Sequence, residues 1–219
     1  MNVPSSTPAG HRYVVIEGPI GVGKTSLAEK LASLMGADLV LEHAEDNPFL
    51  ERFYRSPRTG ALPAQLFFLF QRSRQLQQLR QSDLFAPVRV SDFLLEKDRL
   101  FARVTLDDEE YSLYEQVYDR LAIDTLKPDL VVYLQAPVDV LMDRIARRGI
   151  RYEQAMERAY LERLVEAYTR FFHQYVDSPL LIVNAADVDF LGNEQHFAQL
   201  EAEVKRPRRG RHYFNPFSG

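Results

Sequence analysis

Residues 18–25, which read GPIGVGKT, constrain the fold of this chain more than any other segment. They fit the pattern G-x-x-x-x-G-K-S/T, and they lie between a predicted strand at residues 13–17 and a predicted helix at residues 24–35. In such a loop successive backbone amides point inward, and the amino end of the helix adds positive potential. The segment therefore predicts a site for the phosphates of a nucleoside triphosphate. The alternative is a glycine-rich turn with only a structural role.

The side chains of this loop have separate expected tasks. Lys24 would reach the terminal phosphates, and the Thr25 hydroxyl would help to hold Mg²⁺. Motors, switches and kinases all share such a loop, so the second substrate must be inferred from other segments. The residues expected to bind the nucleotide are Gly18, Pro19, Ile20, Gly21, Val22, Gly23, Lys24 and Thr25.

Short β-rich runs alternate with helical patterns along the chain, which predicts an α/β fold: a parallel sheet covered by helices on both faces. Strands are expected at residues 13–17, 38–41, 88–91, 129–134 and 180–184. Helices are expected near residues 24–35, 48–55, 62–82, 93–103, 107–126, 138–148, 153–177 and 193–205. We expect one domain at residues 13–204, with a disordered leader at residues 1–12 and a basic tail at residues 205–219. The tail is expected to be solvated, the alternative being contact with a polyanion.

Charge and composition exclude several classes of function. The 219 residues include 27 Lys and Arg against 31 Asp and Glu, which gives no general electrostatic reason to bind nucleic acid or an anionic membrane. The absence of cysteine excludes disulfides, cysteine-bound zinc and thiol chemistry. The first residues lack the apolar core of a signal peptide, and no run approaches the ~18 apolar residues of a membrane span. We therefore expect a cytoplasmic protein that binds neither nucleic acid nor membrane.

Glu42 lies at the carboxyl end of the second predicted strand, the edge at which open parallel sheets bind ligands. No Lys or Arg lies between Glu42 and Arg52, so this segment offers no cation to an acceptor that already carries a phosphate. A hydroxyl acceptor benefits from a base by typically ~10²- to 10⁴-fold. The residues therefore favour an alcohol as the phosphate acceptor and Glu42 as its base. The alternative is a solvated residue at the end of a strand.

Four features taken in order resemble the deoxyribonucleoside kinase family, especially its bacterial purine deoxynucleoside kinases. They are Glu42, the NPFLERFY run, the long helix with Gln65 and Arg72, and the Arg-rich segment before Glu153. The resemblance covers about residues 13–205. It implies a P-loop kinase fold with a five-stranded parallel sheet, a homodimer packed through helices, and transfer of the γ-phosphate of ATP to a deoxynucleoside 5′-hydroxyl with Mg²⁺. The resemblance to the bacterial branch also implies a purine as the preferred base. The alternatives are a nucleoside monophosphate kinase and an inactive nucleotide-binding structural subunit.

Gln65 and Arg72 are seven residues apart, so they differ by ~20° around a helix and lie ~10 Å apart along it. One helix face therefore presents both side chains. The resemblance implies that they read the base, with Asp98 as the acidic partner of the arginine. Without the resemblance, the expected interpretation of Gln65 and Arg72 would be a polar pair on an exposed helix.

The resemblance also implies contacts to the sugar and to the base. Tyr54 matches a tyrosine beside the sugar 3′-hydroxyl, and Glu153 matches the carboxylate on the other side of that hydroxyl. Phe101 matches a phenylalanine that stacks under the base, although an isolated phenylalanine on a helix is also a common core residue.

The remaining expected site residues follow the third and fourth predicted strands. Asp92 falls where the family has an acidic residue followed by arginine, but the next residue here is Phe93. We assign Asp92 to Mg²⁺, the alternatives being a proton acceptor or a helix N-cap. Arg144 and Arg148 match lid arginines and lie one turn apart, so both are expected to contact the phosphates, the alternative being a solvated basic helix. The expected catalytic set is Glu42, Asp92, Lys24, Arg144 and Arg148.

Overall fold

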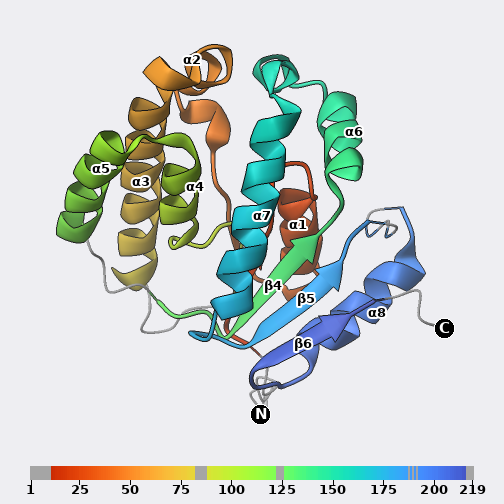
Figure 1. Cartoon of the computed structure of the whole chain (residues 1–219). Helices are drawn as coiled ribbons and strands as arrows, with labels where there is room; N and C mark the ends of the chain where they lie inside the picture. Colours follow the sequence, from red (N-terminus) through yellow and green to blue (C-terminus); the bar gives the residue numbers. More distant parts are fainter. Residues whose placement is uncertain are drawn as a thin grey trace, which may run out of the picture.

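The computed structural model describes residues 11–81, 88–121, 126–186, 188, 190 and 192–215, and it contains a parallel sheet with helices on both faces (Figure 1). The strand order is β2-β3-β1-β4-β5-β6, and every pairing is parallel. The strands are β1 (Tyr13–Glu17), β2 (Asp38–Val40), β3 (Arg89–Ser91), β4 (Leu130–Gln135), β5 (Leu180–Asn184) and β6 (Arg211–Phe214). The predicted α/β fold is confirmed, but the sheet has six strands and not five.

The sixth strand comes from the segment that was predicted to be a solvated basic tail. Strand β6 pairs with β5 from Leu180↔Arg211 to Val183↔Phe214. Arg211 also donates through Nη2 to two carbonyl oxygens at the end of helix α7 (Arg158–Gln174), those of Phe172 (3.1 Å) and His173 (2.5 Å). An edge strand is half exposed, so β6 lacks the continuous apolar run by which central strands are recognised.

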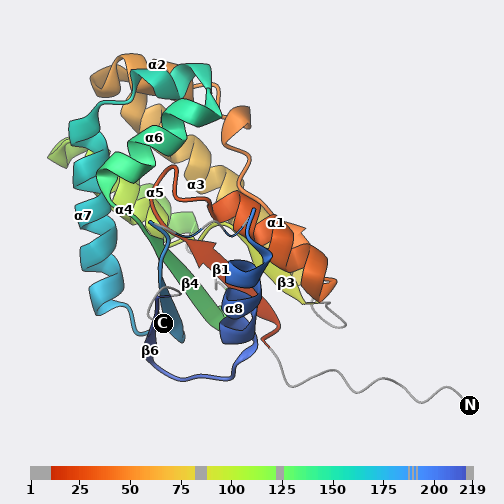
Figure 2. The same cartoon turned by 90° about the vertical axis from the view of Figure 1, so that its right-hand side faces the viewer.

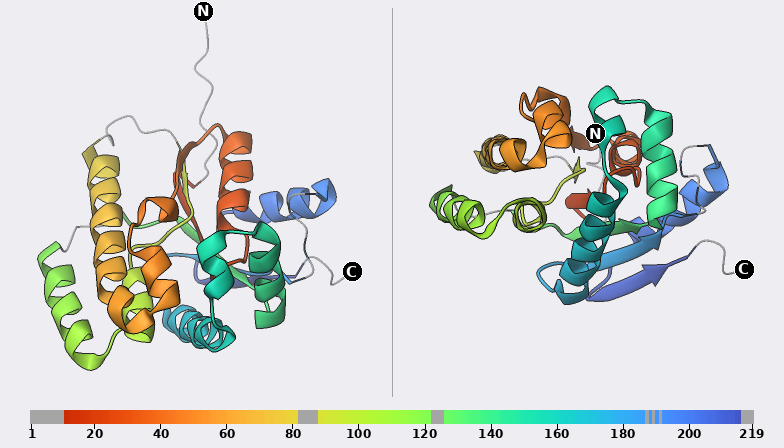
Figure 3. Two further views of the ribbon diagram at one scale, coloured as in Figure 1. Left: turned by 90° about the horizontal axis from the view of Figure 1, so that it is seen from above. Right: turned by 45° about the horizontal axis from the view of Figure 1, so that its top comes forward.

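Helices cover the sheet on both faces. Figure 2 shows α7 on one side of the sheet, with α1 and α8 on the other. Figure 3 shows α3 and α5 at one flank of the molecule, and α8 and β6 at the opposite flank. The helices are α1 (Lys24–Met35), η1 (Ala44–Asp46), α2 (Leu50–Arg55), α3 (Pro57–Gln81), α4 (Lys97–Thr105), α5 (Asp108–Leu121), α6 (Val138–Arg148), η3 (Arg151–Ala155), α7 (Arg158–Gln174) and α8 (Glu194–Lys205).

The central strands form the core because both of their faces are covered. All five residues of β1 are buried, and β4 is buried over its first five residues. Helix α7 packs an aromatic face against β4. The ring of Phe172 on α7 stacks on the ring of Tyr133 on β4, with centroids 4.1 Å apart. This packing also places the Tyr168 hydroxyl at the end of β1, where it donates to the Glu17 carboxylate (3.0 Å).

Helix α3 begins earlier than predicted, at Pro57 rather than at residue 62. Proline suits the first helical position because it has no N–H to satisfy there. A second proline, Pro63, lies inside the helix without ending it. Gly60 allows α3 to cross α2 closely, since a Cβ at this position would lie 2.5 Å from the backbone of Phe53. Residue 82, the predicted end, lies outside the described residues.

Two other predicted helices start later than expected. The prediction of a helix at residues 93–103 is wrong at its start, because the Phe93 amide donates to Ser91 Oγ and the Leu94 amide donates to Glu17. Helix α4 therefore begins only at Lys97. The predicted helix at residues 153–177 is interrupted where Met156 adopts an extended conformation and becomes buried.

Some predicted segments lie partly outside the residues that the structure describes. Residues 1–10 of the predicted leader and residues 122–125 of a predicted helix lie outside them. Arg12, in contrast, is held in place, since its amide donates to Asp129 Oδ2 (2.7 Å) and its carbonyl accepts from the Arg89 amide (2.8 Å). Among the described residues, no helix combines the length and the apolar character needed to cross a membrane.

Candidate active site

The phosphate loop joins β1 to α1, as its predicted strand–loop–helix context requires. Gly21 has φ +83°, and a Cβ there would lie 2.8 Å from Ile145 Cγ1 and 2.9 Å from the Leu141 carbonyl oxygen. Only glycine fits this position without strain. The Lys24 ammonium donates to the loop's own carbonyl oxygens, Gly18 (2.8 Å) and Pro19 (3.2 Å).

The electrostatic environment of Lys24 is unusual for a lysine. Burial and, after it, the nearby charge of Lys97 lower the pKa of its ammonium to about 8, although the carboxylates of Glu17, Glu42 and Asp92 act to raise it. A polyphosphate would add negative charge beside the ammonium and favour its protonated form. The loop can therefore bind an anion through Lys24, and the bound anion in turn stabilises the protonated form of that lysine.

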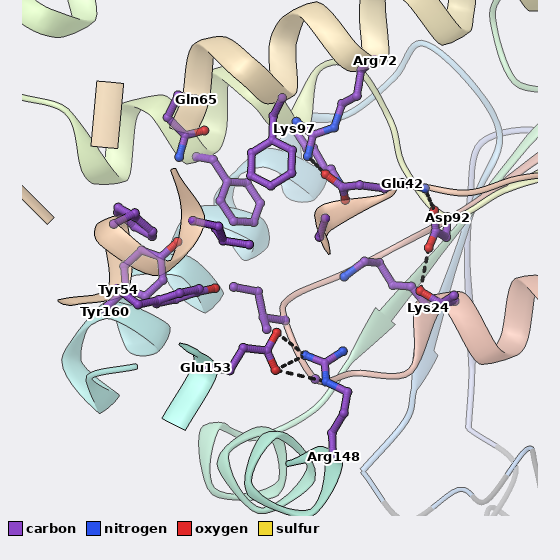
Figure 4. A pocket seen from close by; sticks show the side chains of 18 residues that line it. Lys24, Glu42, Tyr54, Gln65, Arg72, Asp92, Lys97, Arg148, Glu153 and Tyr160 are labelled. Atoms are coloured by element: carbon purple, nitrogen blue, oxygen red, sulfur yellow. Dashed lines mark hydrogen bonds and ion pairs between the residues drawn. The ribbon is translucent and has the colours of Figure 1, made fainter. Parts of the chain in front are cut away.

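Two hollows flank this loop. The first, here called the inner cavity, has a volume of about 130 Å³ and lies towards α2, α3 and α4 (Figure 4). The second, here called the outer cleft, lies towards α6 and the segment after β5. The inner cavity is lined by Ile20, Gly21, Lys24, Thr25, Glu42, Ala44, Leu50, Phe53, Tyr54, Gln65, Phe68, Arg72, Asp92, Lys97, Phe101, Arg148, Glu153 and Tyr160. The outer cleft is lined by Gly21, Val22, Gly23, Lys24, Thr25, Ser26, Leu27, Arg144, Arg147, Arg148, Ala185, Val188 and Phe190.

Glu42 stands in the wall of the inner cavity between two cations (Figure 4). Its carboxylate forms ion pairs with Arg72 Nη2 and, at 2.6 Å, with Lys97 Nζ. Burial raises the pKa of Glu42, but the charges of Arg72 and Lys97 outweigh burial and lower the pKa to about 2. The carboxylate is therefore ionised at neutral pH and able to accept a proton.

The predicted partner of Arg72 is confirmed by the geometry, because its Nη1 forms an ion pair with the fully buried Asp98. The segment that follows Glu42 contains no Lys or Arg up to Arg52, but two cations from other segments reach Glu42 in the folded chain. Arg72 comes from α3 and Lys97 from α4, segments that only the folded chain brings to the end of β2. Both cations are already paired with carboxylates.

Asp92 ties the phosphate loop to the end of β2. Its Oδ2 accepts from the Thr25 hydroxyl (2.6 Å), and its Oδ1 accepts from the Glu42 amide (2.8 Å). Asp92 is buried, and these contacts hold its carboxylate beside Thr25, the other residue expected to bind Mg²⁺. A carboxylate and a hydroxyl are ligands that suit this ion, which takes its other ligands from water and phosphate.

Aromatic side chains and the amide of Gln65 form another part of the cavity lining. Gln65 is buried, and its side chain makes no hydrogen bond to any residue in the described part of the chain. Phe101 contacts Tyr168 edge-to-face with ring centroids 6.0 Å apart, and Tyr54 stacks on Tyr152 at 5.9 Å. Figure 4 shows Gln65 and Tyr54 pointing into the same hollow as Glu42.

The two predicted lid arginines lie in different surroundings. Arg148 lines both hollows and pairs with Glu153 through two contacts of 2.6 Å, a pairing that the sequence did not indicate. Arg144 lines only the outer cleft, and its guanidinium donates to the carbonyl oxygens of Val22 (3.4 Å), Ala185 (2.8 Å) and Ala186 (3.2 Å). The two arginines thus share the outer cleft but have different hydrogen-bond partners.

Sequence reasoning missed six residues of the inner cavity: Ala44, Leu50, Phe53, Phe68, Lys97 and Tyr160. Phe68 lies three residues after Gln65 and four before Arg72, so helical spacing could have found it. Its ring also packs against the Arg72 guanidinium, 4.9 Å from the ring centroid. Lys97 and Tyr160 carry no such signal, because they reach the cavity only through the packing of α4 and α7.

Comparison with known proteins gives concordant matches. A family model described as deoxynucleoside kinase matches residues 14–207. The deoxyguanosine kinase of Bacillus subtilis is 34% identical over 201 residues, which cover 88% of this chain and 96% of that protein. The deoxyadenosine kinase of Lactobacillus acidophilus is 29% identical, covering 83% of this chain and 89% of that protein. A solved structure of deoxyadenosine kinase from M. mycoides with bound dATP superposes with a TM-score of 0.78 at 25% identity, covering 90% of this chain and all of that one.

Proposed function

Since the chain belongs to the deoxynucleoside kinase family, we propose that it transfers the γ-phosphate of ATP to the 5′-hydroxyl of a purine deoxynucleoside. One observation carries this proposal: an ionised Glu42, the phosphate-loop Lys24 and the unbonded amide of Gln65 line a single cavity. The purine preference is supported by two of the relatives, a deoxyguanosine kinase and a deoxyadenosine kinase.

In the proposed reaction Glu42 is the base. The 5′-hydroxyl donates its proton to the Glu42 carboxylate while its oxygen forms a bond to the γ-phosphorus. The bond from that phosphorus to the bridging oxygen breaks, and ADP leaves with the electron pair. Lys24 lies beside the phosphates and stabilises the charge that develops there. Arg144 and Arg148 are proposed to contact the phosphates from α6.

Substrate recognition is proposed to use the rest of the inner cavity. Gln65, with its free donor and acceptor groups, reads the base, while Arg72 is held by Asp98 beside it. Phe101 packs against the base. Tyr54 and Glu153 bind the sugar 3′-hydroxyl. Ligand sites commonly measure ~300 to 1,000 Å³, so side chains around this narrower cavity must part to admit a nucleoside.

We further propose that Thr25 and Asp92 hold Mg²⁺ with the phosphates of ATP. The ion would neutralise charge on the transferring group. Their oxygens already lie 2.6 Å apart, and both line the inner cavity at the phosphate loop. A homodimer packed through its helices and a cytoplasmic location remain predictions, and light scattering of the purified protein tests the first.

The proposed function is tested by incubating the protein with ATP, Mg²⁺ and separate panels of nucleosides and nucleoside monophosphates. We expect turnover of deoxyadenosine or deoxyguanosine to the 5′-monophosphate, with slower turnover of pyrimidine deoxynucleosides. Turnover of monophosphates alone would identify a monophosphate kinase and overturn the role of Glu42. Binding of ATP without transfer to any nucleoside would identify an inactive subunit.

A further inference from the structure

Lys97 is a buried cation that the reaction described above does not use. It is the first residue of α4, and only 3% of its side chain is exposed. Its ammonium lies 2.6 Å from Glu42 Oε2, on the cavity side of the helix (Figure 4). A buried ammonium is costly unless it is paired, so its position must be explained by the groups around it.

The second carboxylate near Lys97 does not depend on it. Glu17 Oε2 lies 4.0 Å from the ammonium. Glu17 is satisfied by other donors: the Gly18 amide at 2.8 Å, the Leu94 amide at 2.9 Å and the Tyr168 hydroxyl at 3.0 Å. Glu42 is therefore the close counter-charge of Lys97, and the pair exists only while Glu42 is ionised.

Lys97 also faces the phosphate loop. Both it and Lys24 line the inner cavity, and its charge contributes, after burial, to the lowered pKa of Lys24. An ammonium has three N–H donors, of which the contact to Glu42 occupies one. The others can be offered to an anion placed between Glu42 and Lys24, which is where the transferred phosphoryl group must pass.

The neighbouring cation Arg72 lacks this freedom. Its guanidinium is held on one side by Glu42 and on the other by the fully buried Asp98. The position after Asp92, where the family pattern has an arginine, is occupied by Phe93, which is completely buried in an apolar cluster. Lys97 is thus the cation beside Glu42 that can exchange its partner.

We propose that Lys97 is a catalytic residue that exchanges the Glu42 carboxylate for the transferred phosphoryl group during the reaction. The inference rests on the proposed function. When the 5′-hydroxyl proton passes to Glu42, that side chain becomes neutral and Lys97 loses its close counter-charge. At the same time the new bond from O5′ to phosphorus brings the phosphoryl oxygens to the acceptor side of the cavity. The ammonium then stabilises the transition state and the bound monophosphate.

The test replaces Lys97 with methionine, which has a similar length and no charge. We expect Lys97→Met to lower kcat by about 10²-fold and to weaken binding of the 5′-monophosphate product by about tenfold or more. The affinities for ATP and for the nucleoside should stay within about threefold of the wild type. Lys97→Arg, which keeps the charge, should restore most of both losses. Lys205→Met, which removes a surface lysine paired with Glu201, is the matched control and should change neither quantity.

Product binding separates this role from a merely structural one. If Lys97 only orients Glu42, Lys97→Met will weaken nucleoside and monophosphate binding equally, and the inference is wrong. If Lys97→Met does not fold, as judged by circular dichroism, Lys97→Arg and Lys97→Gln provide the same comparison of monophosphate with nucleoside affinity. A wild-type protein that phosphorylates no nucleoside contradicts the proposed function itself. An active wild type whose uncharged variants, Lys97→Met and Lys97→Gln, bind the monophosphate normally contradicts the role of Lys97 alone.

Discussion

The inner cavity and the outer cleft share the phosphate loop but hold their charges in different ways. In the inner cavity, side-chain carboxylates pair with side-chain cations: Glu42 with Lys97 and Arg72, and Glu153 with Arg148. In the outer cleft, the Arg144 guanidinium donates to backbone carbonyl oxygens. A carbonyl needs no counter-charge when its partner is lost, whereas a buried carboxylate does.

This difference indicates where the protein is sensitive to change. Removing one charge from the inner cavity takes a close partner from another buried charge and alters the reacting groups directly. Replacing Arg144 in the outer cleft removes donors from the carbonyl oxygens of Val22, Ala185 and Ala186. We therefore expect large and specific effects on the acceptor side and small, general effects on the donor side.

The largest effect is expected from Glu42→Gln. The amide cannot accept the hydroxyl proton, so kcat should fall by roughly 10²-fold or more while ATP binding stays nearly intact. Steady-state kinetics and ATP titration measure both quantities. Asp46→Asn, an exposed acid on η1, serves as the control and should be active. An unchanged rate in Glu42→Gln would move the role of base to Asp92.

Gln65→Ala should change the choice of base. Loss of the amide removes both a donor and an acceptor from the inner cavity, so the preference for purine over pyrimidine deoxynucleosides should fall by about tenfold or more. The ratio of kcat/KM values across a nucleoside panel measures this, with the exposed Gln116→Ala as control. Equal losses for all nucleosides would show that Gln65 does not read the base.

The affinities for ATP and for the nucleoside should depend differently on pH. Lys24 has a pKa of about 8 in the free protein, so it is charged below that value and loses its proton above it. ATP affinity should be constant from pH 6 to 7.5 and fall by up to about tenfold per unit above pH 8. Glu42, with a pKa of about 2, stays ionised throughout this range, so deoxyadenosine affinity should not follow the same curve.

Isothermal titrations with ATP and with deoxyadenosine between pH 6 and 9 provide this measurement. Lys24→Gln has no ammonium to titrate and should lose most of the alkaline dependence of ATP binding. A wild-type ATP affinity that is flat to pH 9, or the same decline in Lys24→Gln, would assign the effect to another group.

The smallest effect is expected from Arg144→Ala. The residue lines only the outer cleft and is held by carbonyl oxygens, so its loss should weaken ATP binding by about fivefold, equivalent to ~1 kcal/mol. Nucleoside affinity should be unchanged. If Arg144→Ala lowered kcat as strongly as Glu42→Gln, the two hollows would not differ as proposed.

Much of the fold and part of the site follow from local pattern. The strand–loop–helix unit around Gly21 is determined by neighbouring residues, and the apolar runs of β1 and β4 reflect their burial on both faces. Gln65 and Arg72 share a helix face because of their spacing alone. The family resemblance then supplied Asp98 as a partner of Arg72, which the ion pair confirms.

Other features depend on contacts between residues that are distant in the sequence. The amide of Leu94 is taken by Glu17, 77 residues earlier, and this contact delays the start of α4 until Lys97. That delay places the Lys97 ammonium beside Glu42. Strand β6 pairs with the edge of β5, although two of its four residues, Arg211 and His212, are basic.

The sequence by itself determined that this chain builds a parallel sheet around a phosphate-binding loop, because the periods of strands and helices and the needs of a tight glycine turn are local. Only the tertiary structure decided which charges meet inside the cavity, where Glu42 takes Lys97 and Arg72 from two different helices. The physical reason is that a buried charge is stabilised by whichever opposite charge packing brings within a few ångströms, and distance along the chain does not specify that partner.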